Sequence, residues 1–126
     1  MRKNYSSGAP WEEIVGYSRA VKINDVVEVS GTTSVRDGKV VGSNAYEQTK
    51  VCLKSIQEAL ENAGASLNHV VRTRMFVTDI TNWEEVGRAH GEFFSQIKPA
   101  TTMVEISNLI DPKMLVEIEV TAISDK

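Results

Sequence analysis

The chain has 126 residues, of which 41% are hydrophobic and 25% charged, a composition typical of one soluble domain with an ordinary core. Its net charge of −3 and its scattered Lys and Arg residues argue against a nucleic-acid-binding surface, which needs a clustered basic patch. No apolar run approaches the roughly 20 residues that span a bilayer, and no apolar signal segment begins the chain, so we expect a cytoplasmic protein without a membrane anchor.

Residues 1–126 are predicted to form a single domain, in which residues 1–15 are a loosely ordered N-terminal segment. Ser6, Ser7, Gly8 and Pro10 interrupt any periodic pattern in this segment. Trp11 is its candidate anchor to the rest of the domain.

A β-hairpin is the first clear element. Two β-patterned runs, residues 18–23 and 26–33, flank Asn24 and Asp25, whose residue types tolerate the positive φ of a two-residue turn. Asp37 and Gly38 predict a second turn shortly afterwards.

A helix is predicted from Asn44 to Ala63, because apolar residues recur there at spacings of three and four. Asn44 with Glu47 resembles a capping pair, and Gly64 suits the left-handed residue after a last helical turn. Cys52, the single cysteine, lies on the apolar stripe and is interpreted as a small buried hydrophobe rather than a reactive thiol.

The rest of the chain predicts one helix and three strands: a strand over residues 70–78, a helix over residues 82–96, and strands over residues 101–107 and 115–123. His90, on the inward stripe of this helix, is interpreted as a packed histidine with one satisfied hydrogen bond. In the last strand Glu117 and Glu119 share one face, because successive strand side chains point in opposite directions.

This element order predicts an α+β fold in which two helices cover one face of a single sheet. We expect the opposite face to be polar, assuming that each strand is buried by its valine-rich side. That face would carry Glu28, Ser30, Thr32, Arg72, Arg74, Phe76, Thr101, Met103, Glu105, Glu117, Glu119 and Thr121. Its mixture of charged and large apolar residues predicts partial cover by another subunit; the alternative is a solvated sheet face.

The sequence contains no glycine-rich phosphate loop, no metal-ligand spacing of His and Cys, and no GxSxG serine. We therefore expect neither a cofactor nor a metal. The remaining candidate is the acidic face of the last strand, where a partly desolvated Glu117 or Glu119 could position a water or shuttle a proton. The alternative is that both carboxylates are solvated and paired with Arg72 or Arg74.

Several segments carry a family resemblance: GYSRAV, VEVSG, the run from YEQTKV to MFVTDI, and PA-x-x-x-VE followed by LVEIEVTAI. In these segments the chain resembles the Rid family, also called the YjgF family, whose founding group is the reactive-intermediate imine/enamine deaminases. The resemblance implies a chorismate-mutase-like (Rid-type) α+β subunit. It also implies a homotrimer whose sheets line a central barrel, with small-molecule sites in the clefts between subunits.

The resemblance further implies roles for individual residues. Tyr17, Ser30 and Gly31 match positions of the family's substrate cleft. Glu117 matches the glutamate thought to orient the water that attacks the imine carbon, and is the implied catalytic residue. Thr101 stands where the family has the arginine that clamps the substrate carboxylate.

The threonine changes the expected specificity. An arginine guanidinium that binds a carboxylate through two hydrogen bonds typically contributes roughly 2 kcal/mol more than one neutral hydrogen bond, or about thirtyfold in affinity. We therefore expect an arginine-lacking branch of the family that accepts a different ligand at Thr101 and its neighbours. Arg74 or Arg72 is the hypothesised replacement for the missing charge.

Three functions follow from the sequence. The first is a hydrolase of an imine, enamine or related compound, with Glu117 guiding water. The second is a non-catalytic trimer that binds a metabolite and regulates a partner. The third is an endoribonuclease, which ranks last because the sequence offers little for phosphates and no evident pair of proton-transferring histidines.

Overall fold

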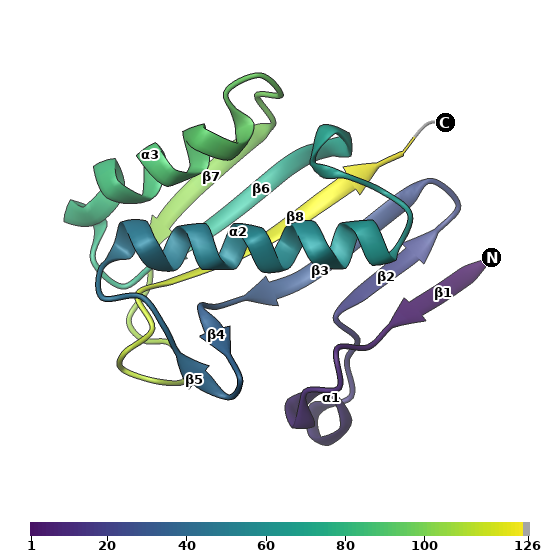
Figure 1. Ribbon diagram of the computed structural model, residues 1–126, viewed down its shortest axis with the longest axis horizontal. Coiled ribbons are helices and arrows are strands. Elements are labelled where there is room, and N and C mark those ends of the chain that lie inside the picture. The colour runs from purple at the N-terminus through teal and green to yellow at the C-terminus, as the bar shows by residue number, and fades with distance from the viewer. Residues whose placement is uncertain (125–126) are drawn as a thin grey trace.

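A six-stranded sheet forms one layer of the structure, a computed structural model that describes residues 1–124 (Figure 1). Its strand order is β1-β2-β3-β8-β6-β7, and neighbours pair antiparallel except for the parallel pair β6 and β7. The strands are β1 (Arg2–Tyr5), β2 (Ala20–Ile23), β3 (Val26–Thr32), β6 (Val70–Val77), β7 (Ala100–Glu105) and β8 (Val116–Ile123).

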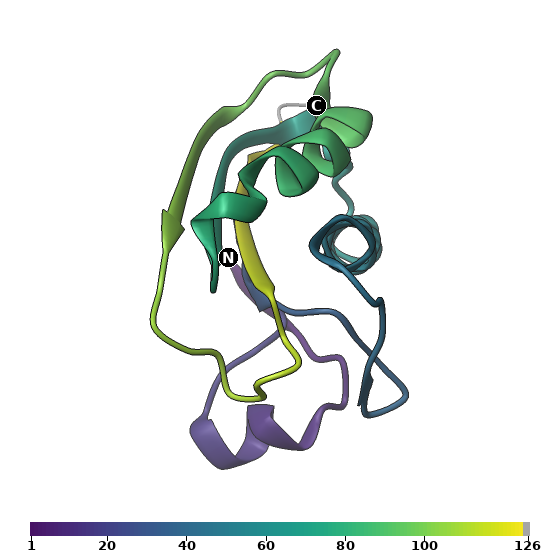
Figure 2. The same cartoon turned by 90° about the vertical axis from the view of Figure 1, so that its left-hand side faces the viewer.

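Two helices, α2 (Ala45–Asn62) and α3 (Trp83–Phe94), form the second layer, and both lie on the same side of the sheet (Figure 2). The apolar stripe of α2 and the valine-rich sides of β3, β6 and β8 form the buried core between the layers. The predicted α+β architecture, one sheet covered on one face by two helices, is confirmed. None of the helices in residues 1–124 has the length and apolar character needed to cross a bilayer.

The turns and caps follow from local chemistry. Asn24 and Asp37 adopt positive φ values of 54° and 53° in the two predicted turns, the second of which joins the short strands β4 (Val35–Arg36) and β5 (Lys39–Val40). Asn44 caps α2 by accepting a hydrogen bond from the Glu47 amide at 2.8 Å. Gly64 follows the helix with a φ of 81°.

Cys52 has the predicted role of a buried apolar side chain. It is fully buried on the inward face of α2. Burial raises the pKa of its thiol to about 12, and the charge of Glu117 adds to the shift. A thiol with this pKa is not a nucleophile near neutral pH.

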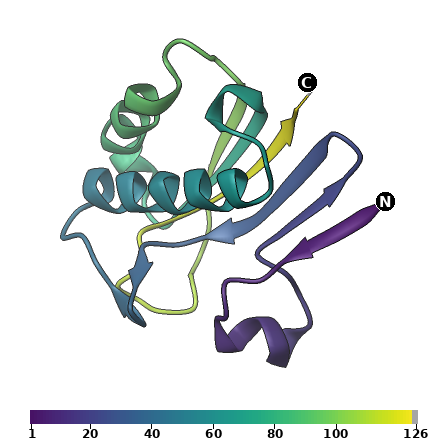
Figure 3. The same ribbon diagram turned by 45° about the vertical axis from the view of Figure 1, so that its right-hand side comes forward.

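The N-terminal segment is more regular than the sequence suggested. β1 pairs with β2 along the sheet edge, and α1 (Pro10–Val15) follows it (Figure 3). Trp11 is 50% exposed, so the buried Glu12 anchors the segment instead. Burial alone would raise the pKa of Glu12, but hydrogen bonds from Ser7 and Ser6 outweigh it and leave the pKa below its usual range.

Two irregularities in the strand register change which residues face the helices. The pairing of β3 with β8 shifts between Val29 and Thr32, and Thr32 is buried opposite Ile118 instead of lying on the open face as predicted. The pairing of β6 with β8 shifts after Val70, which leaves Val71 44% exposed. Alternation alone cannot predict such shifts, because one extra residue reverses the faces that follow.

The prediction that Thr101 and Met103 lie on the open face is wrong. Thr101 pairs with Thr73 in the parallel register of β6 and β7, and the two hydroxyl oxygens are 2.8 Å apart. Thr73 is buried beneath α3, where its hydroxyl lies 3.0 Å from Nε2 of His90. Met103 packs against the core, and Glu105 is on the same side by register. In an edge strand, apolar and polar residues alternate too weakly for the sequence to predict which side of the sheet each side chain occupies.

His90 is the packed histidine that the sequence predicted. Its ring lies 4.7 Å from the ring of Phe94, and its one side-chain hydrogen bond within residues 1–124 is with Thr73. Burial lowers the pKa of His90, so the neutral imidazole is favoured.

Gln48 joins the start of α2 to the loop before β8. Its side-chain Nε2 donates to the carbonyl oxygens of Gly42 at 3.2 Å and Lys113 at 2.9 Å. Its Oε1 accepts from the amide of Leu115 at 2.8 Å. Because Gln48 is buried, no solvent replaces these bonds if the side chain is lost.

We expect Gln48→Ala to lower the free energy of unfolding by about 2–4 kcal/mol, because it leaves buried polar groups unpaired and opens a cavity. Urea unfolding measures the loss. Gln57→Ala, on the same helix with an exposed contact to Glu61, is the matched control and should cost less than about 0.5 kcal/mol. Equal losses for the two variants would contradict this account of Gln48.

Candidate carboxylate site on the open sheet face

The two glutamates of β8 both lie on the open face, but their surroundings differ. Residues of β8 alternate between buried and partly exposed, with Glu117 and Glu119 in the second group. Glu119 pairs with Arg74 across the sheet, and its Oε2 lies 3.4 Å from Nη1 of that arginine. Both side chains are more than one-third exposed, so this is an ordinary surface ion pair.

Glu117 has no comparable partner. It lies opposite Phe76 of β6, and no side-chain hydrogen bond or ion pair to Glu117 occurs within residues 1–124. Burial raises the pKa of Glu117, the nearby charge of Glu119 raises it further, and Arg19 opposes both with a smaller effect. Of the two carboxylates, Glu117 is therefore the one whose surroundings disfavour the ionised form and favour uptake of a proton.

Gly31 makes room for the Glu117 carboxylate. It lies in the irregular part of β3, between the two registers that β3 forms with β8. A Cβ atom at position 31 would lie 2.8 Å from Cδ of Glu117 and closer still to its Oε2. Any larger residue at position 31 would therefore displace the Glu117 carboxylate from its present position.

Arg19 is a site residue that the sequence analysis did not identify. Its Nη2 donates to the carbonyl oxygen of Gly31 at 2.7 Å, and its guanidinium lies 6.0 Å from the ring centre of Tyr17. Arg19 thus holds the backbone of Gly31, the residue that the Glu117 carboxylate approaches most closely. The only available signal was its position in GYSRAV, and nothing in that spacing distinguishes it from a surface arginine.

The other residues predicted near Gly31 are also close to it. Tyr17 is partly exposed and, together with Ser30, lines an open cleft of about 470 Å³. Ser30 donates from its hydroxyl to the carbonyl oxygen of Ser18 at 2.6 Å, which joins β3 to the segment before β2. Tyr17, Ser30, Gly31 and Glu117 therefore form one connected region through Arg19 and the β3 backbone.

Within one chain, Thr101 does not meet this region. It lies on edge strand β7, on the helix side, while Gly31 is on β3 and Glu117 on the open face of β8. Its hydroxyl lies 3.0 Å from the carbonyl oxygen of Pro99 and bonds with Thr73. Arg74 does face the same side as Glu117, as predicted, although it is engaged with Glu119.

Arg72 is engaged elsewhere on the sheet. Its Nη2 donates to the hydroxyl of Thr102 at 2.7 Å, so it does not pair with either glutamate of β8. Residues 1–124 contain no group of three or more His, Cys, Asp or Glu side chains arranged to hold a metal ion.

The fold and this site define an α+β protein with a desolvated carboxylate on an open sheet face. The chain belongs to the Rid family, also called the YjgF family, because residues 8–124 match the family model described as Endoribonuclease L-PSP. The resemblance found in the sequence is thereby confirmed at the level of the family.

Solved structures and curated relatives agree with this assignment. Rv2704 from Mycobacterium tuberculosis, a member of the YjgF/YER057c/UK114 family, has a TM-score of 0.92 at 48% identity, covering 98% of this chain and 100% of that chain. YyfA of the Rid protein family from Yersinia pestis has a TM-score of 0.86 at 30% identity, with the same coverage. The uncharacterized protein SCO2049 from Streptomyces coelicolor is 39% identical over 95% of this chain and 90% of its own length. The RutC family protein PYRAB12510 from Pyrococcus abyssi is 36% identical over 84% of each chain.

We expect Gly31→Ala to destabilise the protein by no more than about 1 kcal/mol, because the new methyl group overlaps the Glu117 carboxylate, which is the flexible end of its side chain and can move aside. The loss should shrink when Glu117→Ala is present, since that change removes the overlapping atoms. Unfolding of the two single variants and the double variant measures this coupling. Gly87→Ala is the control: no atom lies within 4 Å of its added Cβ, and it should be neutral or stabilising in α3. Additive effects at positions 31 and 117 would contradict the proposed contact.

The raised pKa of Glu117 predicts a pH-dependent stability difference. The folded state binds the Glu117 proton more tightly than the unfolded state, so stability is lost as the pH rises from the unfolded value through the folded value. Glu117→Gln should therefore have a higher Tm than the wild type at pH 8, and the difference should vanish near pH 4. Melting curves at pH 4, 6 and 8 test this, with Glu28→Gln on the same sheet face as control. A Tm difference that is constant with pH would contradict the shift.

Proposed function

We propose that this protein is a cytoplasmic, homotrimeric hydrolase that acts on an imine, enamine or related carbonyl-derived metabolite in clefts between subunits. The observation that carries the proposal is the state of Glu117. Its carboxylate is half-buried and forms no ion pair or hydrogen bond in the described chain, although the charge of Arg19 acts on it weakly, while the adjacent Glu119 is paired with Arg74. An unpaired, desolvated carboxylate lacks a structural role and can act on water.

In the proposed reaction, the imine is protonated on its nitrogen. The Glu117 carboxylate accepts a hydrogen bond from a water molecule that lies next to the imine carbon. The water oxygen attacks this carbon while one of its protons moves to Glu117. The nitrogen of the resulting amino alcohol takes up the proton from Glu117 and leaves as ammonia while the C=O double bond forms. The hydroxyl proton then moves to the released ammonia. A carbonyl compound and ammonium are the products, and the carboxylate is regenerated.

The proposed trimer, with its sheets lining a central barrel, would cover the open face. Phe76 and Glu117 already lie half-buried on this face of the isolated subunit. Trp11, Ile14 and Val15 of α1 are at least half exposed and offer further apolar contact area. In such an assembly Tyr17, Ser30 and Gly31 of one subunit would meet edge strand β7 of another. This arrangement would bring Thr101 into the site that it does not reach within one chain.

The ligand would differ from the family's carboxylated imines. Thr101 offers no charge, and its hydroxyl is engaged with the Pro99 carbonyl and Thr73. Arg74 is the proposed substitute for the clamping arginine, because it faces the same side as Glu117. The branch that lacks this arginine would bind a carboxylate about thirtyfold more weakly at position 101.

A trimer that binds a metabolite and regulates a partner is the second candidate, and the neutral Thr101 favours it because a binder does not need the clamp. Endoribonuclease activity, which the name of the family model suggests, has less support. His69 accepts a local hydrogen bond from the Ser66 amide at 3.0 Å, and His90 is packed in the core. Neither is available as part of a proton-transferring pair.

The function is tested with freshly generated imines, with and without a carboxylate group. We expect the wild type to hydrolyse uncharged imines, Glu117→Ala to lose at least about a hundredfold of this rate, and Glu28→Gln to retain it. Thr101→Arg should gain activity on carboxylated imines. If the wild type and Glu117→Ala are equally inactive on every compound, the regulatory binder becomes the better account.

A further inference from the structure

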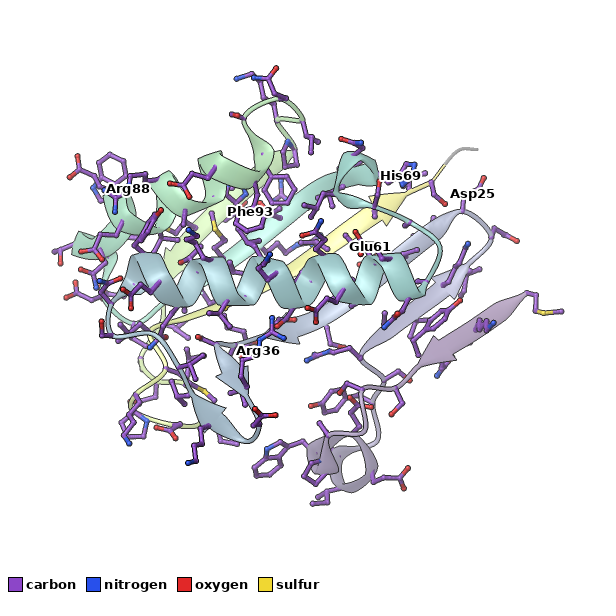
Figure 4. All side chains as sticks on the ribbon, in the orientation of Figure 1. Asp25, Arg36, Glu61, His69, Arg88 and Phe93 are labelled. Atoms are coloured by element: carbon purple, nitrogen blue, oxygen red, sulfur yellow. The ribbon has the colours of Figure 1, made fainter. Side chains whose placement is uncertain are left out.

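The hydroxyl group of Thr101 belongs to a chain of hydrogen bonds that begins in the core. His90 extends from α3, which lies over the β6–β7 edge of the sheet (Figure 4), and its Nε2 is 3.0 Å from the hydroxyl oxygen of the buried Thr73. That oxygen is 2.8 Å from the hydroxyl oxygen of Thr101, which in turn is 3.0 Å from the carbonyl oxygen of Pro99. Of the two hydroxyl groups, Thr101 is the exposed one and can contact a ligand.

The direction of each bond follows from the number of hydrogen atoms available. A carbonyl oxygen only accepts, so the Pro99 carbonyl takes the one hydrogen of the Thr101 hydroxyl. Thr73 then donates to Thr101, and because its only hydrogen is used, it accepts from Nε2–H of His90. Burial lowers the pKa of His90, so the donor is a neutral imidazole that carries its proton on Nε2. The bonds therefore all point from the core toward the surface.

This direction determines what Thr101 offers to a ligand. Its hydrogen is committed to Pro99, and one of its two lone pairs accepts from Thr73. Within residues 1–124 no further side chain bonds to this oxygen, which leaves one lone pair. A ligand acceptor such as a carboxylate must compete with the Pro99 carbonyl for the hydrogen and gains little. A ligand N–H or O–H adds a hydrogen bond without breaking one.

We propose that Thr101 is a specificity-determining residue that accepts a hydrogen bond from the substrate, so that the substrate carries a neutral N–H or O–H donor in place of a carboxylate. A primary amide fits best, because it has the planar shape and size of a carboxylate and supplies N–H donors. The substrate class is then an imine or enamine that carries a carboxamide group. This inference rests on the proposed function, since Thr101 reaches the site only in the proposed trimer.

Binding of stable carbonyl compounds tests this preference without any need for turnover. The probes are pyruvamide, methyl pyruvate and pyruvate, which share one carbon skeleton. The amide donates N–H groups, the ester is neutral and only accepts, and the carboxylate is charged and only accepts. Calorimetric titration of the full chain gives the three affinities.

The variants separate the hydroxyl of position 101 from the rest of β7. Thr101→Ser keeps the hydroxyl, and Thr101→Val replaces it with a methyl group of similar size. Thr102→Val is the matched control, because it makes the same change at the next residue of the strand. The Thr102 hydroxyl accepts from Arg72 on the other side of β7.

We expect the wild type and Thr101→Ser to bind pyruvamide about fivefold or more tightly than methyl pyruvate. Thr101→Val should lose this preference and Thr102→Val should retain it. The proposal is overturned if none of the three probes binds the wild type, if the ester or the carboxylate binds it as tightly as the amide, or if Thr101→Val keeps the preference. The wild-type comparison decides the question even if a variant does not fold.

The direction of the chain has a readout that needs no ligand. ¹⁵N NMR of the imidazole groups at pH 8 should find His90 neutral, with its proton on Nε2. His69 is the reference in the same spectrum, because its Nδ1 accepts from the Ser66 amide at 3.0 Å and its proton is therefore also on Nε2. A proton on Nδ1 of His90 would mean that Thr73 donates to the ring, which would overturn the proposed chain.

Hydrolysis of the corresponding imines separates this inference from the proposed function. Turnover of uncharged imines that needs Glu117 but shows no preference for the amide would leave the hydrolase standing and remove the role of Thr101. A preference for pyruvamide that depends on Thr101, without hydrolysis of any imine, would support Thr101 as the acceptor and contradict only the hydrolase.

Discussion

The close contact between the Glu117 carboxylate and Gly31 is the constraint on which the rest of the site depends. β3 changes register with β8 at this point, and Gly31, which has no side chain, leaves room there for the carboxylate. Arg19 then donates a hydrogen bond to the carbonyl oxygen of the same glycine. The Glu117 carboxylate lies over backbone and opposite Phe76, and Arg19 offsets its charge less than burial and Glu119 disfavour it, so ionisation of Glu117 costs free energy. The protein tolerates this cost at Glu117 while neutralising the neighbouring Glu119 with Arg74.

The same irregularity gives β3 two chemically different sides. Its open side holds Glu117, and its helix side borders a cavity of about 300 Å³ that Arg19 helps to line. Arg19 reaches both, because it bonds to the glycine carbonyl between them and interacts with the charges of Glu12 and Glu117. A change at either side therefore alters the electrostatics of the other. This coupling is a property of one subunit, whereas the cleft that would include Thr101 requires a neighbouring subunit.

Much of the fold follows directly from the sequence. The stripe on α2, the Asn44 cap and the Asn24 turn are local, so the residues that determine them lie within a few positions of one another. The faces of Thr32 and Thr101 could not be predicted in this way, because a register shift sets the first and parallel pairing with β6 sets the second. Strand alternation identified Glu117 and Glu119 as candidates, and the family resemblance chose Glu117 between them. Gly31, Ser30 and Tyr17 were found through the resemblance alone. Arg19 was missed because its partner carbonyl lies 12 residues away, across a hairpin.

The central claim is that Glu117 is a desolvated carboxylate with a raised pKa. A ¹³C NMR titration of the glutamate side-chain carboxyl carbons, with Glu117→Gln used to assign the resonance, measures this property without assuming any substrate. The account predicts that Glu117 titrates clearly above the ordinary glutamate range of about 4.3, and that Gly31→Ala moves its pKa back toward that value by displacing the carboxylate into water. A Glu117 pKa at or below the ordinary value in the wild-type protein would contradict the account.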